Sequence, residues 1–151
     1  MIQFTAFGGS LLFGRISGNL GVKQSLMITL MIWCVVLTGA FAVGWTGYPI
    51  TEYFVLGVIA GLVMGASQSL ARTMQALFTP PEREAEFFGF FAVSGRFASV
   101  LGPLTYGVVV AITGSLRWAI LSVIIFFLAG MALLSTVRTP EAEYARNEAT
   151  S

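Results

Sequence analysis

Residues 118–137, WAILSVIIFFLAGMALLSTV, contain no charged side chain, and neither do residues 97–116, FASVLGPLTYGVVVAITGSL. A helix rises about 1.5 Å per residue, so roughly 20 apolar residues cross the ~30 Å hydrocarbon layer of a bilayer. Both stretches are continuously apolar and lack the in/out alternation of barrel strands, which favours helices. Each is predicted to be a membrane-spanning helix.

The same criterion places four full spans at about residues 25–44, 53–73, 87–113 and 118–137. Residues 1–13 are also apolar, but as a helix they would cover only about 20 Å, which indicates a truncated span. The predicted fold is all-α, a polytopic membrane helix bundle of four full transmembrane helices and a truncated N-terminal one in residues 1–137. Residues 138–151 are predicted to form a cytoplasmic polar tail.

The composition excludes several classes of protein. The 151-residue chain is 56% hydrophobic and 10% charged, against about 25% charged residues in a soluble domain, so a water-soluble globular protein is excluded. A net charge of +1 provides no basic surface for nucleic acid. The chain has no His and no Asp, so we expect no enzyme, no metal site and no cofactor. The single Cys34 is interpreted as a small buried hydrophobe.

Basic residues are distributed unequally between the two sides of the predicted membrane. One side has only Arg117. The other side has Arg15, Lys23, Arg72, Arg83, Arg138 and Arg146. Because loops rich in Lys and Arg stay in the cytoplasm, we expect an integral protein of the plasma (inner) membrane with a cytoplasmic C terminus.

The connections between spans carry turn and cap residues. Residues 45–49, WTGYP, form a short Gly- and Pro-containing loop with aromatic side chains suited to the membrane interface. Before the third span, Thr79 is predicted to cap a helix, with Pro80 at its first position and Glu82 three residues after the cap.

Small residues recur every four positions in the second full span, at Gly57, Gly61, Gly65, Ser69 and Thr73. The third full span contains Gly102 and Pro103, which predict a bend where a backbone hydrogen bond is lost. Helices in lipid associate through close backbone contact at small residues. These residues are therefore predicted to pack helices tightly, or to let them slide or bend during a transport cycle.

Arg96 lies about 14 Å inside the third full span, where an Arg costs about 2.5–3.5 kcal/mol on insertion. No Glu lies within any predicted span, so its partner must be a carbonyl, a hydroxyl such as that of Ser94 or Ser99, water, a substrate anion or another polypeptide segment. Both a substrate or gating role and a structural polar contact stay open. The predicted spans thus contain no carboxylate that could relay a proton.

Gln68 and Arg72 lie one helical turn apart on one face of the second full span. Two interpretations are open for each residue. Both could line a cavity; alternatively, Arg72 is a snorkelling interfacial anchor and Gln68 makes an interhelical hydrogen bond.

Residues 14–23, GRISGNLGVK, resemble a degenerate copy of the cytoplasmic loop motif of the major facilitator superfamily, with Gly14, Gly21 and Lys23 in place. Gly18 and Asn19 stand where that pattern has an acid and a base. These two residues cannot form the ion pair that such an acid and base would make.

Residues 65–91, GASQSLARTMQALFTPPEREAEFFGFF, resemble the vacuole-effluxer-like family, relatives of the autophagy-related amino acid effluxers. The matching positions are Gly65, Gln68, Arg72, Pro80, Glu86, Phe87, Phe88 and Gly89. Ala71 and Thr73 replace two serines of the pattern. Arg96 and Phe97 resemble the Lys-Phe element of the family, and Gly102 and Pro103 resemble its Gly-Pro element.

The resemblance implies part of the C-terminal half of a major facilitator superfamily transporter, an alternating-access carrier of amino acids or similar small solutes. The polar residues of the spans, Arg96, Gln68, Arg72 and Ser94, are the candidates for substrate binding or gating. Such carriers hold the solute between two six-helix halves, so we expect a fragment whose partners are the bilayer and missing N-terminal helices of the same transporter or another chain. The alternative is a self-sufficient small oligomeric membrane protein, a scaffold or small multidrug-type exporter that associates through its GxxxG faces.

Overall fold

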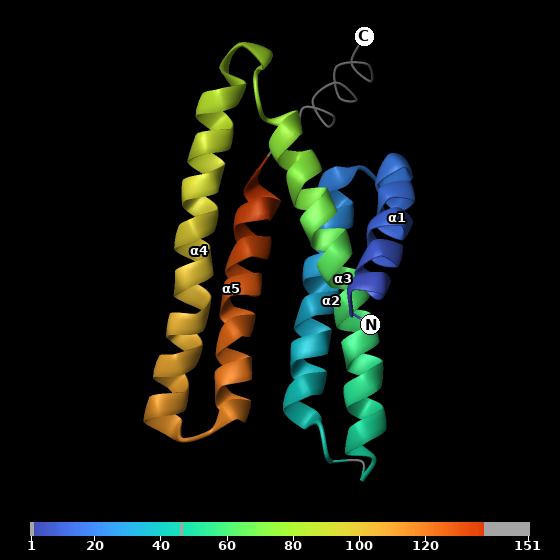
Figure 1. Ribbon diagram of the computed structural model, residues 1–151, viewed down its shortest axis with the longest axis vertical. Coiled ribbons are helices and arrows are strands. Elements are labelled where there is room, and N and C mark those ends of the chain that lie inside the picture. The colour runs from blue at the N-terminus through green and yellow to red at the C-terminus, as the bar shows by residue number, and fades with distance from the viewer. Residues whose placement is uncertain (1, 46, 138–151) are drawn as a thin grey trace.

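A computed structural model describes residues 2–45 and 47–137 of the chain. These residues form α-helices and one short 3₁₀ helix, η1, so the predicted all-α fold is confirmed (Figure 1). The elements are α1 (Ile2–Leu20), α2 (Val22–Ala42), α3 (Pro49–Leu77), η1 (Pro81–Arg83), α4 (Glu84–Thr113) and α5 (Leu116–Thr136). The predicted tail at residues 138–151 lies outside the described residues.

Four segments of the described chain are long and apolar enough to cross a membrane, as predicted. They are Val22–Ala42, Pro49–Leu77, Pro81–Thr113 and Leu116–Thr136. The observed helices begin a few residues before the predicted spans. The 29 residues of α3 extend about 44 Å, so this helix projects beyond a ~30 Å hydrocarbon layer.

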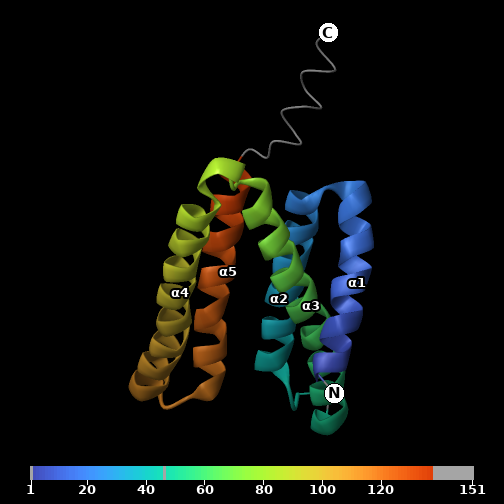
Figure 2. The ribbon, with the colours of Figure 1, turned by 45° about the horizontal axis from the view of Figure 1, so that its top comes forward.

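The helices run up and down in two groups (Figures 1 and 2). α1, α2 and α3 pack together, with α1 along α3, while α4 and α5 form a hairpin. α5 lies against α2 and so joins the hairpin to the first group. The α2–α3 and α4–α5 turns lie at one end of the molecule, and η1 lies at the other (Figure 1).

The core lies around α3 because its small and aliphatic residues face α1 and α2. Val63, Ala66 and Leu70 are at most 2% exposed. The main cluster of buried residues is Phe13, Val22, Ala66, Leu70 and Met74. In contrast, the 30 residues of α4 include none that is buried. The described chain therefore leaves α4 without a cover on most of its surface.

The N-terminal helix differs from the expectation of a short apolar span followed by a loop. α1 continues through residues 14–20, so most of the predicted loop motif is helical, and only Gly21 separates α1 from α2. Gly21 has a φ of 84°, a conformation that costs glycine little because it has no Cβ. The Gly21 N–H still donates to the Ser17 carbonyl at 3.0 Å, as in a continuing helix, so α1 ends because of the non-helical φ and ψ of Gly21 itself.

The predicted Thr79 cap is wrong. The Thr79 hydroxyl donates to the Gln75 carbonyl at 2.7 Å, at the end of α3, and α4 begins only at Glu84. Pro80 is extended, with φ −64° and ψ 138°, because the following Pro81 disfavours a helical conformation at the residue before it. Pro81 instead starts η1, so the two prolines delay the helix by several residues.

Candidate functional site

A groove of about 560 Å³ lies between α2, α3 and α5. Its α3 wall contains Ser67, Gln68 and Ala71, and its other walls are apolar. The lining residues of α2 and α5 are Leu26, Leu30, Gly130, Leu133, Leu134 and Val137. Ser67 and Gln68 therefore supply the polar side chains of a groove whose other lining residues are apolar.

Gln68 and Arg72, which were predicted to share one face of this helix, differ in their surroundings. Both side chains are exposed, but Gln68 lines the groove and Arg72 is not among the groove residues. Ala71 takes the groove position beside it because neighbouring residues of a helix point about 100° apart. The structure thus brings Gln68, but not Arg72, to the groove.

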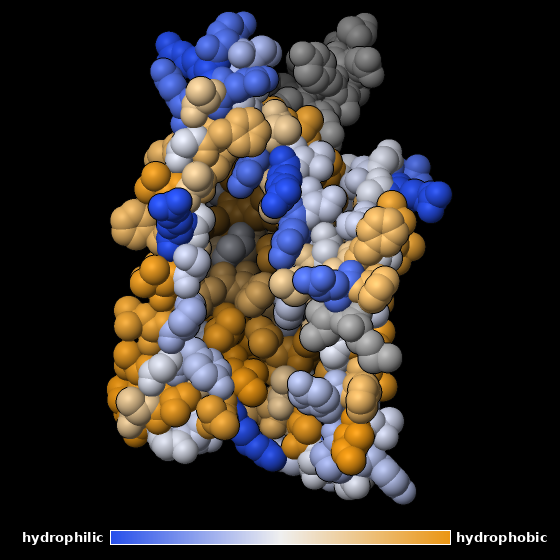
Figure 3. Space-filling view, in the orientation of Figure 1, coloured by the Kyte–Doolittle hydropathy of each residue, from blue (hydrophilic) through white to orange (hydrophobic). Residues whose placement is uncertain are grey.

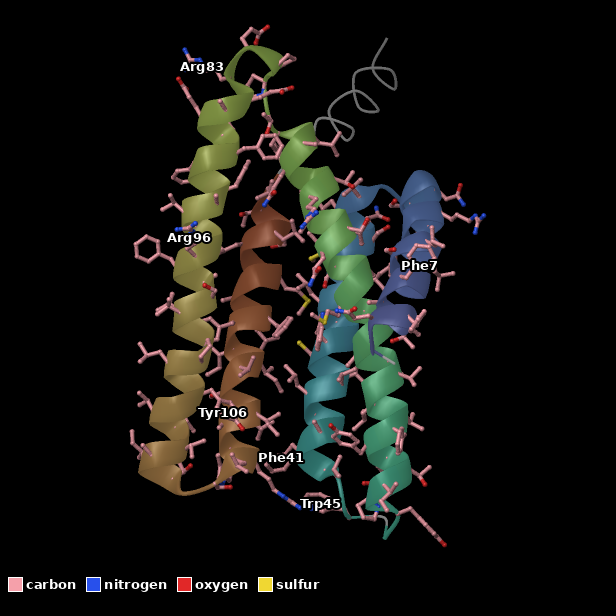
Figure 4. All side chains as sticks on the ribbon, in the orientation of Figure 1. Phe7, Phe41, Trp45, Arg83, Arg96 and Tyr106 are labelled. Carbon is pink, nitrogen blue, oxygen red and sulfur yellow. The ribbon has the colours of Figure 1, made fainter. Side chains whose placement is uncertain are left out.

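Arg96 lies on α4 between Arg83 and Tyr106 (Figure 4). Its side chain is exposed and makes no hydrogen bond or ion pair with the described residues. The Ser99 hydroxyl donates instead to the Arg96 backbone carbonyl, at 2.7 Å, and Ser94 is also exposed. Neither predicted hydroxyl therefore compensates the guanidinium.

One face of the molecule is hollowed between the α4–α5 hairpin and α3, and apolar side chains form its floor (Figure 3). The surface of α4 is strongly apolar, with exposed side chains that include Phe90, Phe97, Leu104 and Ile112. Arg96 is the charged residue in the middle of this helix. A guanidinium on an uncovered apolar helix requires an anion, water or another protein segment beside it.

The packing glycines of α3 fall into two groups. Gly61 is buried, and a Cβ added at Gly65 would overlap the Ala6 carbonyl of α1. Gly57 has no atom within 4 Å of its Cβ position apart from those of its own stretch of helix, and the same holds for Gly102 of α4. Pro103 lies inside α4, on its exposed surface.

The α1 side of this crossing was missed by the sequence reasoning. A Cβ at Gly9 would overlap the Leu62 carbonyl of α3, so Gly9 and Gly65 form the two halves of one close helix crossing. The Gly8–Gly9 pair was the available signal, because small residues mark helix interfaces in lipid.

A second cavity, of about 710 Å³, lies at the opposite end of α2 and α3. Trp45, Tyr48 and Glu52 are among its lining residues. The Gly44 N–H donates to the Glu52 carboxylate oxygen Oε2 at 2.6 Å, so Glu52 closes the α2–α3 turn. The sequence signal that could have predicted this contact is the acid Glu52, which lies in the first turn of α3, eight residues after the turn glycine Gly44.

The residues of the predicted cytoplasmic loop motif are separated in the structure. Gly14 lies within α1 with no neighbour at its Cβ position, and Gly21 forms the break between helices. Lys23 lies in the first turn of α2, and its ammonium Nζ donates to the carbonyls of Ser135 and Val137 at the end of α5.

The chain matches a known protein family along nearly its whole length. The profile of the family described as "Vacuole effluxer Atg22 like" matches residues 1–149. The chain is similar to the "Uncharacterized MFS-type transporter YxiO" of Bacillus subtilis, with 30% identity over 135 residues, 89% of this chain and 31% of that protein. No solved structure matches.

Two proteins named "Autophagy-related protein 22" are also similar. The one from Cryptococcus neoformans is 28% identical over an alignment of 161 residues, covering 99% of this chain and 29% of that protein. The one from Saccharomyces cerevisiae is 31% identical over 98 residues, covering 65% and 18%. The chain thus spans less than a third of the length of these relatives. With four membrane-length helices and a family match along nearly its whole length, this integral membrane protein belongs to the Atg22-like vacuole effluxer family of transporters.

Proposed function

We propose that this chain forms part of a secondary active transporter that works by alternating access and moves amino acids or similar small solutes. The observation that carries the proposal is the family match over residues 1–149 on a chain with four membrane-length helices. The relatives are about three times longer, so the remaining helices belong to the same transporter or to another chain. The whole transporter would place the solute between two helical halves.

The apolar surface of α4 supports the proposal that further helices complete the transporter. None of its 30 residues is buried, although a polytopic bundle packs its helices against several neighbours. The additional helices would cover the hollowed face between α4 and α3 (Figure 3). This arrangement would enclose a path next to Gln68 and α4.

Arg96 is the proposed contact for the anionic group of the solute. A guanidinium presents planar N–H donors that bind a carboxylate in a bidentate way, and every amino acid carries a carboxylate. Gln68 supplies an amide that both donates and accepts hydrogen bonds, and Arg72 and Ser94 are the remaining substrate-binding or gating candidates.

The ion whose movement drives transport would not bind in the membrane-embedded middle of the described helices. Glu52, Glu84 and Glu86, the acids of α3 and α4, all lie in the first turn of their helix. A carboxylate there faces the membrane interface and not the middle of the bilayer. A proton relay would therefore use residues of the remaining part of the transporter.

We also propose that the C terminus is cytoplasmic and that the membrane is the plasma (inner) membrane. Arg83 and Trp45 lie at opposite ends of the bundle, and Lys23 lies near the end of α5 (Figure 4). Since Lys23, Arg83 and Arg15 belong to the end with more basic residues, that end is the cytoplasmic one.

The test is transport in reconstituted vesicles. The longest open reading frame that contains this chain would be purified, inserted into liposomes and screened for uptake of each radiolabelled amino acid, with the 151-residue chain assayed in parallel. Uptake by the longer protein alone supports the proposal. Uptake by the 151-residue chain as an oligomer would replace it with the small self-sufficient exporter, and no amino acid uptake by either would overturn the proposed cargo.

A further inference from the structure

α2 and α5 are matched in length and in the position of a basic residue. Each has 21 residues, and the second residue is Lys23 in α2 and Arg117 in α5. The two helices pack side by side and run in opposite directions (Figure 1). Each basic residue therefore lies beside the C-terminal end of the other helix.

Lys23 binds the end of α5 through two backbone carbonyls. Its Nζ donates to the Ser135 carbonyl at 3.0 Å and to the Val137 carbonyl at 2.6 Å. The last carbonyls of a helix have no partner within the helix and carry a partial negative charge. The nearby Leu133 carbonyl accepts the Thr136 hydroxyl, so Lys23 completes the set of contacts that ends α5.

Arg117 makes the corresponding contact at the other end. Its Nη2 donates to the Val43 carbonyl, the C-cap of α2, at 3.1 Å. The Ala42 carbonyl accepts the Trp45 N–H at 3.2 Å, so the end of α2 is also closed by a local bond and by a cation from α5. Arg117 is the one basic residue on its side of the membrane by the sequence count, and this contact gives it a structural purpose there.

Aromatic contacts connect the two helices between these ends. The rings of Trp33 and Phe127 have centroids 5.6 Å apart, and those of Phe41 and Trp118 lie 5.9 Å apart in an edge-on arrangement. Trp33 and Phe127 are each the twelfth residue of their helix, so this contact lies midway between the two ends, whereas the Phe41–Trp118 contact lies at the Arg117 end.

We propose that Lys23 and Arg117 form a reciprocal clasp that makes α2 and α5 one rigid two-helix unit. Each cation closes the C-terminal end of the other helix, so sliding or splaying of the pair breaks a contact at one end or the other. The clasp itself does not depend on transport. Its use as a fixed frame during alternating access rests on the proposed function.

The clasp also determines the shape of the groove. Leu26 and Leu30 of α2 and Leu133, Leu134 and Val137 of α5 form its walls, and Lys23 holds the Val137 end. Loss of Lys23 is expected to let the end of α5 move away from α2 and widen the groove there, without changing the Arg117 end.

The test measures distances at each end of the pair by electron spin resonance, with the chain in lipid nanodiscs and no solute. In a Cys34→Ser background, spin labels at Gln24→Cys and Thr136→Cys report on the Lys23 end. Labels at Thr38→Cys and Leu116→Cys report on the Arg117 end. All four positions are exposed.

We expect Lys23→Met to at least double the width of the distance distribution at its own end and to leave the other end narrow. Arg117→Met should do the reverse, and Lys23→Arg and Arg117→Lys should keep both narrow. Arg72→Met is the matched control, because it removes a basic side chain that makes no hydrogen bond or ion pair within the part of the chain that the structure describes.

The end that keeps its basic residue serves as the internal control for folding. Unchanged widths in Lys23→Met and Arg117→Met would overturn the clasp, as would broadening of both ends by either single variant or an equal effect of Arg72→Met. Because no solute is present, these results are separate from the vesicle assay, and either proposal can fail alone.

Discussion

The backbones of α3 at Gly65 and of α1 at Ala6 approach so closely that a Cβ on Gly65 would overlap the Ala6 carbonyl oxygen. The reciprocal position, Gly9 on α1, meets the Leu62 carbonyl of α3 in the same way. Only glycine fits at both positions because backbone carbonyls, unlike flexible side chains, cannot move aside cheaply. This crossing attaches the N-terminal helix to the central helix of the bundle.

Gly65→Ala is expected to destabilise the chain by about 1–3 kcal/mol, the usual cost of overpacking. Thermal unfolding in detergent, followed by tryptophan fluorescence, measures the change. Gly57→Ala is the matched control, since it lies on the same helix with no atom within 4 Å of the new Cβ. An equal loss in both variants would attribute the effect to the helix itself and not to the crossing.

Arg96→Leu is expected to favour membrane insertion of the α4 segment by about 3–4 kcal/mol, because the substitution removes a charge from the middle of an apolar helix. A glycosylation-based insertion assay with the α4 segment in a host protein measures this. Arg83→Leu, at the end of the segment, should change insertion much less. Similar effects of the two substitutions would place Arg96 near the interface instead of deep in the bilayer.

In the complete transporter, Arg96→Ala is expected to reduce amino acid uptake about tenfold or more, while Arg72→Ala has a smaller effect. Arg96 makes no hydrogen bond or ion pair with the described residues, so its substitution removes only the proposed contact with the solute. Arg72 lies near the C-terminal end of α3, where a basic side chain can reach the membrane interface. Initial uptake rates in vesicles, with equal amounts of inserted protein, provide the comparison. Wild-type uptake by Arg96→Ala would remove Arg96 from the mechanism.

Impermeant thiol reagents are expected to label Glu82→Cys from the cytoplasmic side and Tyr48→Cys from the opposite side, in a Cys34→Ser background. The two positions lie in connections at opposite ends of α3, and the basic residues predict which end is cytoplasmic. Labelling of intact and permeabilised cells distinguishes the sides. The reverse pattern would invert the proposed orientation, and labelling of both positions from one side would contradict the four-span topology.

Several site residues could be predicted from the sequence only in part. Gln68 and Arg96 stand out because polar residues are costly inside an apolar run, which is a property of the sequence alone. The surroundings of these two residues do not follow from the sequence. Gln68 lines the groove because α5 packs against α2, and Arg96 stays uncovered because α4 packs mainly on α5. Gly57 and Gly65 belong to the same sequence pattern, yet only Gly65 meets another helix closely.

The sequence by itself determined that this protein is helical and lies in a membrane, because the length of an uncharged run compared with the thickness of a bilayer is a local property. Tertiary structure alone decided that Gly9 meets α3 and that Lys23 and Arg117 close the ends of each other's helices. Their partners are backbone carbonyls, which every residue possesses, so no sequence pattern identifies them. Only the packing of the helices brings a particular carbonyl within reach of a particular cation.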